Sequence, residues 1–265
     1  MIHLRDVALA YGTHTVFSGV DIRVERGLIH AIIGPTGCGK TSMLMLMAGL
    51  LKPATGSLVF EIEKDRNHVA LIPQDYGLFP WKTVGGNVLM GLEIAVARQG
   101  VFRRVPAVAK AKTDLLLQEL RIHDLRDRWP LTLSGGQKQR TAIARALAVD
   151  PVLLLMDEPF SALDADIRED MQNLLMELPT TWGATPVIVT HDISEALRVA
   201  DRLILFRLQD NAHSIANNSD GGSQDAATFI VECFPNEKTK KVEMEQKVRS
   251  ALRNARDKDS SKARP

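Results

Sequence analysis

The sequence predicts an α/β fold with a mostly parallel β-sheet at its core. Short runs rich in Val, Ile and Leu, bounded by Gly, Pro or charged residues, alternate with helical patterns over residues 1–206. Such alternation is typical of a doubly wound sheet, whose parallel strands are buried on both faces. The strands predicted in this way lie at residues 28–33, 69–72, 152–156, 187–189 and 203–206.

The N-terminal residues 1–27 follow a different pattern. Apolar and polar residues alternate over residues 2–9 and again over residues 20–24. This period of two indicates strands of an antiparallel layer with one face in solvent. We therefore expect an antiparallel β layer ahead of the parallel core.

Residues 77–134 are predicted to be a helical subdomain inserted in the α/β domain. The segment carries no strong strand signal, and residues 84–97 and 110–120 have helical spacing. The predicted organisation is therefore one α/β domain over residues 1–206 that contains this insertion.

Residues 207–265 are predicted to form a C-terminal tail. Gly, Ser, Asn and Asp dominate residues 211–225, which is typical of a loop, and residues 228–234 have the composition of a strand. Four apolar residues further on have the i, i+3, i+4, i+7 spacing of an amphipathic helix: Val248, Ala251, Leu252 and Ala255. Whether this tail regulates, dimerises or only packs stays open from the sequence.

Composition excludes several classes of function. The chain has 265 residues, enough for one domain and a small appendage. Its 33 Lys and Arg balance 32 Asp and Glu, so the net charge of +1 gives no global attraction to nucleic acid or anionic lipid. The longest apolar run, residues 43–51, is far shorter than the ~20 residues of a membrane-spanning helix. Two cysteines, Cys38 and Cys233, cannot build a disulfide framework, so we expect a reducing compartment.

Residues 34–41 match the phosphate-binding pattern G-x-x-x-x-G-K-[ST]. Glycines let backbone N–H groups converge on phosphate oxygens, and the helix that begins near Thr41 adds its positive dipole end. Lys40 can reach the β- and γ-phosphates, and the Thr41 hydroxyl suits Mg²⁺. Cys38 is expected to be a small filler of the loop. The predicted nucleotide-binding residues here are Gly34, Pro35, Thr36, Gly37, Cys38, Gly39, Lys40, Thr41 and Ser42.

The predicted strand at residues 152–156 ends in two carboxylates, Asp157 and Glu158. Ligands of open parallel sheets bind at the carboxyl ends of the strands, where these side chains are expected. Asp157 is placed to hold the Mg²⁺ shell. Glu158, one residue further, could polarise an attacking water as a general base.

The run Leu133-Ser134-Gly135-Gly136-Gln137, about 20 residues before Asp157, resembles the signature motif of ABC ATPases. With the phosphate loop upstream and the Asp-Glu strand downstream, the chain is similar to that family over residues 1–206. The resemblance implies a P-loop NTPase fold of the ABC type, hydrolysis of ATP, and ATP and Mg²⁺ as cofactors.

The resemblance also implies roles for isolated residues. Tyr11 would stack on adenine, Gln74 would coordinate Mg²⁺ and sense the nucleotide, and His191 would contact the γ-phosphate and position water. The plainer alternatives are a strand-edge tyrosine, an exposed turn glutamine and a structural histidine. The implied catalytic residues are Glu158, His191 and Lys40, and the implied metal ligands are Thr41, Gln74 and Asp157.

Ser134 is expected to cap a helix that begins near Gly135. In ABC ATPases two chains pair head to tail, and the signature of one closes over the phosphates held by the other. The resemblance therefore implies that Ser134, Gly135, Gly136 and Gln137 bind the ATP of a second copy, and that Asp164 bridges the two sites.

A translocation path would have to lie on separate permease subunits. Residues 73–84 resemble the segment that receives a permease's coupling helix, and Phe79 and Trp81 could offer it an apolar socket, unless they pack inside the helical subdomain. The amino-acid sequences of residues 78–84 and 190–197 are most similar to those of the nitrate/sulfonate/taurine importer ATPases.

The function expected from this resemblance is ATP-driven import of a small anion such as nitrate, sulfonate or taurine. The protein would lie peripherally at the cytoplasmic face of the inner membrane and serve a substrate-binding protein indirectly, with no nucleic-acid partner. The alternatives are the ATPase subunit of an exporter with separate membrane subunits, or an importer of another small solute. A repair or chromosome-organising ATPase would need a long coiled-coil insertion, and residues 42–133 have no sustained heptads.

Overall fold

The computed structural model describes residues 2–61, 69–98, 107–208 and 229–235, and residues 243, 245, 246, 248–250 and 252 beyond them. The predicted loop at 211–225 and the helix positions Ala251 and Ala255 lie outside the described residues. The chain divides into two compact units. The first contains Met1–Glu25, His30–Glu61 and Thr190–Pro265, and the second contains Arg26–Ile29 and Ile62–Val189.

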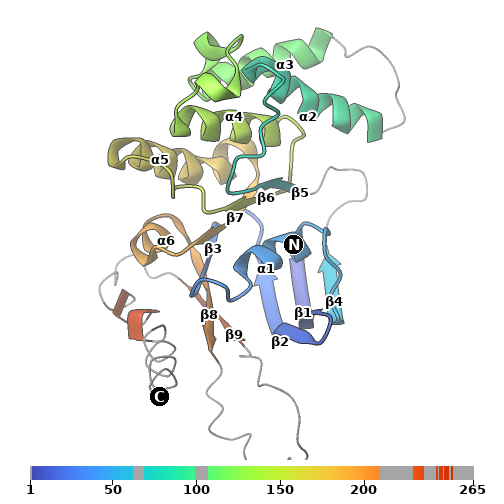
Figure 1. Cartoon of the computed structure of the whole chain (residues 1–265), viewed down its shortest axis with the longest axis vertical. Helices are drawn as coiled ribbons and strands as arrows, with labels where there is room; N and C mark the ends of the chain where they lie inside the picture. The colour runs from blue at the N-terminus through green and yellow to red at the C-terminus, as the bar shows by residue number, and fades with distance from the viewer. Residues whose placement is uncertain are drawn as a thin grey trace, which may run out of the picture. The chain divides into compact units, whose positions relative to one another are not determined.

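The first unit is built on strands in the order β4-β1-β2-β9-β8-β3 (Figure 1). The N-terminal strands pair antiparallel, as the period-two pattern predicts, whereas β3 pairs parallel with β8. The late strand β9 pairs antiparallel with β8. The strands and helices of this unit are β1 Ile2–Tyr11, β2 His14–Val24, β3 His30–Ile33, α1 Lys40–Met47, β4 Thr55–Phe60, α6 Ile193–Val199, β8 Arg202–Leu208 and β9 Phe229–Pro235.

The core of the first unit joins its antiparallel and parallel parts. Phe17 of β2 and Phe206 of β8 are fully buried, and their rings meet edge to face with centroids 5.9 Å apart. This is a favoured geometry for aromatic pairs. All four residues of β3 are buried as well, which anchors the start of the phosphate loop that follows it.

The second unit contains the parallel strands β7-β6-β5 and a group of helices. Every residue of β6 is buried, in keeping with its unbroken apolar run. Helices α2, α3 and α4 pack on one another, and α5 lies beside α4 (Figure 1). The elements are β5 Val69–Ile72, α2 Val84–Arg98, α3 Ala107–Glu119, the 3₁₀ turns His123–Leu125 and Pro130–Thr132, α4 Gly135–Leu147, β6 Leu153–Asp157, α5 Ala165–Trp182 and β7 Thr185–Thr190.

The predicted fold class is therefore confirmed, with one strand that the sequence analysis missed. That strand, β4, has no buried residue and pairs along the edge of β1. Without a buried face it lacks the alternation by which strands are detected. Among the described residues, no helix is both long and apolar enough to cross a bilayer.

Replacing Leu154 by Ala should destabilise the protein by about 2–5 kcal/mol, because Leu154 in β6 is fully buried and the truncation leaves a cavity. Leu131→Ala is the matched control: this leucine is 82% exposed, and its truncation should change the free energy of unfolding by less than about 0.5 kcal/mol. Urea denaturation measures both values. Equal effects of the two substitutions would contradict the burial assigned to β6.

Candidate active site

The loop between β3 and α1 has a backbone that only glycine can adopt at its key positions. Gly37 and Gly39 have φ of 82° and 93°, in the left-handed region. A Cβ on Gly39 would lie 2.4 Å from Val16 Cγ1, and one on Gly34 would lie 2.7 Å from Phe206 Cβ. The loop is thus packed closely against β2 and β8: Gly34 is required by space, Gly37 by conformation, and Gly39 by both.

Lys40 lies folded back into this loop. Its side chain is buried, and its Nζ donates to the carbonyl oxygens of Gly34 at 3.0 Å and Pro35 at 2.7 Å. No described side chain caps the start of α1, whose N-cap is Gly39. A helix start without a side-chain cap and a buried ammonium group together fit a phosphate chain, which would replace the two carbonyls as partners of Lys40.

Cys38 is the buried filler that its small size suggested. Its Sγ would be 2.8 Å from a Cβ on Gly34, so the thiol occupies the space beside that glycine. Burial raises the pKa of the Cys38 thiol, while the charge of Lys40 opposes this shift. A thiol in this environment is protonated at neutral pH and is a weak nucleophile.

Tyr11 lies at the end of β1, beside the phosphate-loop helix. Its side chain is half exposed, and its hydroxyl donates to Ser42 Oγ at 3.3 Å. The ring is therefore held near Ser42, the third residue of α1, with much of its surface in solvent. This position leaves an aromatic surface available for a base to stack on.

Gln74, Asp157 and Glu158 come together in the second unit because β5 and β6 are parallel neighbours, so their carboxyl ends meet. Gln74 Nε2 donates to Glu158 Oε2 at 3.3 Å. Asp157 is the last residue of β6 and is nearly buried. The Asp157 carboxylate and the Gln74 amide oxygen are hard oxygen donors of the kind that Mg²⁺ prefers.

Glu158 has an unusual backbone. Its φ is 48°, a conformation that costs a non-glycine residue energy. Two hydrogen bonds hold it: the Glu158 N–H donates to Val189 O at 2.9 Å, and Ser161 Oγ donates to Glu158 O at 3.1 Å. Such strain is characteristic of functional positions, where the surroundings fix a side chain in one direction.

His191 lies in the tight turn between β7 and α6. The next residue, Asp192, caps α6 by accepting from Ser194 N at 2.7 Å, and the Asp192 N–H donates to Thr190 Oγ1 at 3.0 Å. The turn holds an exposed imidazole at the end of the strand. The sequence analysis identified His191 but missed Asp192, although an Asp directly before a short apolar helical run is an N-cap signal.

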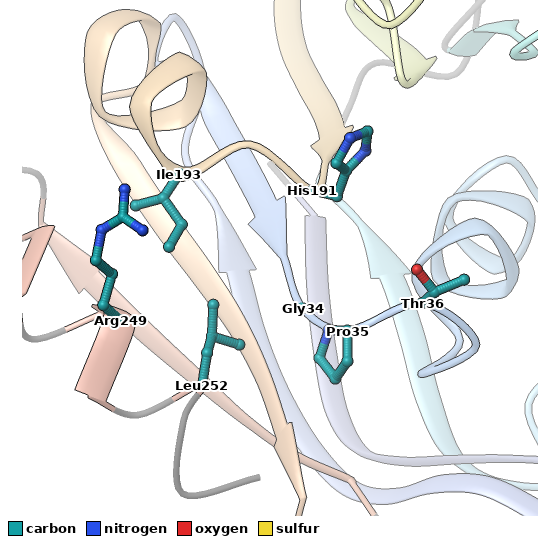
Figure 2. Close-up of a pocket in the computed structure, with 7 residues that line it drawn as sticks. All are labelled: Gly34, Pro35, Thr36, His191, Ile193, Arg249 and Leu252. Atoms are coloured by element: carbon teal, nitrogen blue, oxygen red, sulfur yellow. The ribbon is translucent and has the colours of Figure 1, made fainter. Parts of the chain in front are cut away.

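His191 and the phosphate loop line a cavity of about 370 Å³ in the first unit (Figure 2). Loop residues Pro35 and Thr36 contribute one side, and Ile193 of α6 contributes another. Two tail residues, Arg249 and Leu252, complete the lining, and Arg249 pairs with Glu245 one helical turn earlier. Two residues of the predicted tail helix thus line the same cavity as the phosphate loop, which the periodicity of the tail alone could not indicate.

The signature residues form the predicted cap at the start of α4. Ser134 Oγ accepts from Gln137 N at 3.4 Å, and Ser134 N donates to Gln137 Oε1 at 3.0 Å, a complete capping box. Ser134 is exposed. The start of this helix is therefore an ordered, solvent-facing end that can present N–H groups and a hydroxyl to an anion.

The two signature glycines are required by packing. A Cβ on Gly135 would lie 2.9 Å from Ala162 O, and one on Gly136 would lie 2.4 Å from Ile167 Cγ2. Asp164 lies between these contacts as the N-cap residue of α5, with an exposed side chain. The signature and Asp164 are thus neighbours in one unit.

Comparison with known proteins identifies the family. The ABC transporter family profile matches residues 17–161 of this chain. An aliphatic sulfonates import ATP-binding protein of Rhodopseudomonas palustris is 41% identical over 203 residues, which cover 77% of this chain and 69% of that protein. The chain belongs to the ABC transporter family. The predicted resemblance and the predicted fold are therefore confirmed.

Two further similarities extend this result. A sulfate/thiosulfate import ATP-binding protein of Pseudomonas aeruginosa is 40% identical over 212 residues, or 77% of this ABC chain, which spans 63% of that relative's length. A dimeric ATP-binding cassette solved in a post-hydrolysis state with ADP and phosphate superposes with a TM-score of 0.66 at 29% identity. That match covers 77% of this chain and 94% of the solved chain.

Gly39→Ala should weaken MgATP binding at least tenfold and destabilise the protein by about 1–3 kcal/mol, because the Cβ meets Val16 and φ is left-handed. Gly49→Ala is the matched control, since Gly49 also has a left-handed φ of 72° but nothing within 4 Å of its Cβ position. The Gly49→Ala variant should lose stability but keep its affinity for MgATP. Titration with a fluorescent ATP analogue and thermal unfolding separate the two effects, and unchanged binding by Gly39→Ala would contradict the site.

Proposed function

We propose that this chain is the ATP-hydrolysing subunit of an ABC importer, which pairs with a second copy around two ATP molecules. The observation that carries the proposal is the phosphate loop. A Cβ on Gly34 or Gly39 would overlap its neighbours, and the Lys40 ammonium group lies inside the loop, where it donates to the carbonyl oxygens of Gly34 and Pro35 and lies 3.9 Å from Cys38 Sγ. A cationic nest of this kind suits a triphosphate.

We propose that residues 34–42 bind the phosphates, with Lys40 on the β- and γ-phosphates and Tyr11 stacked on the adenine. Thr41, Gln74 and Asp157 would hold Mg²⁺, which neutralises charge on the phosphate oxygens during transfer. The buried position of Asp157 and the exposed amide of Gln74 are compatible with these roles.

Glu158 is proposed as the general base. It would take a proton from the water that attacks the γ-phosphorus, while His191 contacts the γ-phosphate and orients that water. The bond from Gln74 Nε2 to Glu158 Oε2 supports this assignment, since it ties the base to a residue that would also sense the metal. The turn capped by Asp192 gives His191 a defined direction.

We propose that the second copy completes each site. Ser134, Gly135, Gly136 and Gln137 of one chain would cover the phosphates bound by the other, and Asp164 would bridge the two sites. The exposed, capped start of α4 supports this role. A solved cassette of similar fold is a dimer with ADP and phosphate bound.

Import is proposed on the basis of the relatives, two of which are named for the import of sulfate or thiosulfate and of aliphatic sulfonates. The substrate of this system would be a small anion of this kind, with nitrate and taurine as further candidates. Separate permease subunits would dock at Phe79 and Trp81, whose rings lie 5.4 Å apart, with Trp81 67% exposed. The chain would then lie peripherally at the cytoplasmic face of the membrane, and an exporter subunit is the alternative.

Glu158→Gln should lower ATP turnover about 10²–10⁴-fold and leave ATP affinity unchanged, because the amide keeps the shape but cannot accept the proton. Phosphate release and nucleotide titration measure the two quantities. Glu119→Gln, at an exposed position that ends α3, is the control and should hydrolyse ATP normally. Near-normal turnover by Glu158→Gln would refute the base assignment.

Mixing two inactive variants tests the head-to-tail arrangement. Lys40→Ala and Ser134→Arg should each abolish hydrolysis, since each spoils both sites of a homodimer. A mixed dimer holds one fully intact site, so a random mixture should recover up to roughly a quarter of the parent activity. Failure to recover any activity, although mixed dimers form, would contradict sites shared between copies.

A further inference from the structure

The segment from Gln74 to Trp81, called here the 74–81 loop, has a bent backbone at its centre. Tyr76 and Gly77 have φ of 67° and 56°, and this region is costly for a tyrosine. A non-glycine residue stays in such a conformation only where its surroundings impose it. The 74–81 loop begins at the partner of Glu158 and ends at the exposed Trp81.

Arg145 of α4 binds the bend from outside the loop, while Tyr76 N donates locally to Pro73 O at 2.9 Å and Gly77 N to Asp75 Oδ1 at 3.2 Å. Arg145 Nη1 donates to Gly77 O at 2.5 Å, and its Nη2 donates to Tyr76 O at 3.1 Å. The same guanidinium lies over the Phe79 ring, 5.5 Å from its centroid. The planar fork of arginine serves two successive carbonyls and a ring at once, whereas a lysine ammonium offers no such fork.

Two other contacts hold the 74–81 loop to its neighbours. A Cβ on Gly135, the first residue of α4, would lie 3.4 Å from the Tyr76 hydroxyl. On the other side the buried amide of Asn87 in α2 accepts from Phe79 N at 2.8 Å and donates to Phe79 O at 3.1 Å. The 74–81 loop is therefore fixed between α2 and the signature helix α4.

Separating the 74–81 loop from α4 would be costly. Burial lowers the pKa of the Arg145 guanidinium, and the charge of Asp75 opposes the shift. A partly buried cation that loses both carbonyl partners is left with unsatisfied donors. Conformations in which the 74–81 loop moves and α4 stays are thus disfavoured.

We propose that Arg145 is a positioning residue that makes the signature helix and the 74–81 loop move as one body. The inference rests on the proposed function, in which ATP held by a second copy engages the start of α4. Arg145 then transmits that event to the Phe79–Trp81 surface proposed to face the permease. No contact of Arg145 with nucleotide is needed.

Hydrogen exchange of the full chain with MgATP as the probe tests this role. In the Glu158→Gln parent, MgATP should slow exchange about fivefold at the first-turn amides of α4 and at the 76–79 amides. In Arg145→Ala the response of α4 should persist, while that of the 76–79 amides should fall below about twofold. Arg145→Lys keeps the charge but not the fork, so it should also lose the response of the 76–79 amides while that of α4 persists. It replaces Arg145→Ala in the test if the Ala variant does not fold.

Arg140→Ala is the matched control. Arg140 is also a partly buried arginine of α4, but its guanidinium donates to Leu120 O at 3.0 Å and lies 3.8 Å from Asp170, so its described partners are outside the 74–81 loop. Both responses should survive in this variant. A 76–79 response that persists in the Arg145 variants, or that is lost equally in Arg140→Ala, would overturn the inference alone. No MgATP response at α4 in the parent would overturn the proposed function and the inference together.

Discussion

The close approach of the phosphate loop to the strands around it is the constraint on which the site depends. Gly39 lies against Val16 of β2, and Gly34 lies against Phe206 of β8, at distances where a Cβ would overlap. Both the antiparallel layer and the parallel part of the first unit therefore pack against the phosphate loop. Because a close-packed interior cannot absorb an extra carbon without moving, the loop backbone is held in one shape.

Close packing at glycine positions also occurs in the second unit, at the signature residues. Gly135 and Gly136 let α4 approach the segment that begins α5, and a capping box orders the first turn of α4. Parallel pairing of β5 with β6 brings Gln74 to Glu158 at the neighbouring strand ends. This member of the ABC transporter family thus has two helix starts suited to bind anions, one in each unit, and a pair of oxygen donors at neighbouring strand ends.

Residues joined by short-range patterns could be found from the sequence. The phosphate loop, the Asp-Glu strand end and the cap at Ser134 each depend on neighbours within a few positions, and the structure has Ser134 bound to Gln137 as expected. The edge strand β4 was missed because none of its residues is buried. Asp192 was missed although its signal is local, because the helix that it caps, α6, is only seven residues long and carries a short apolar pattern.

The family and the parallel core with its antiparallel layer could be read from sequence patterns alone, and the same patterns predict the residues for phosphate and magnesium. The contacts that hold the 74–81 loop, and the cavity that the tail residues line, depend on which distant segments the fold brings together. Arg145 meets Gly77 and Tyr76 across 68 and 69 positions, and Leu252 lines the same cavity as phosphate-loop residues more than 200 positions before it. Hydrophobic periodicity reports which face of a helix is buried but not against which distant segment, so an arginine on α4 could not be distinguished from a solvated one.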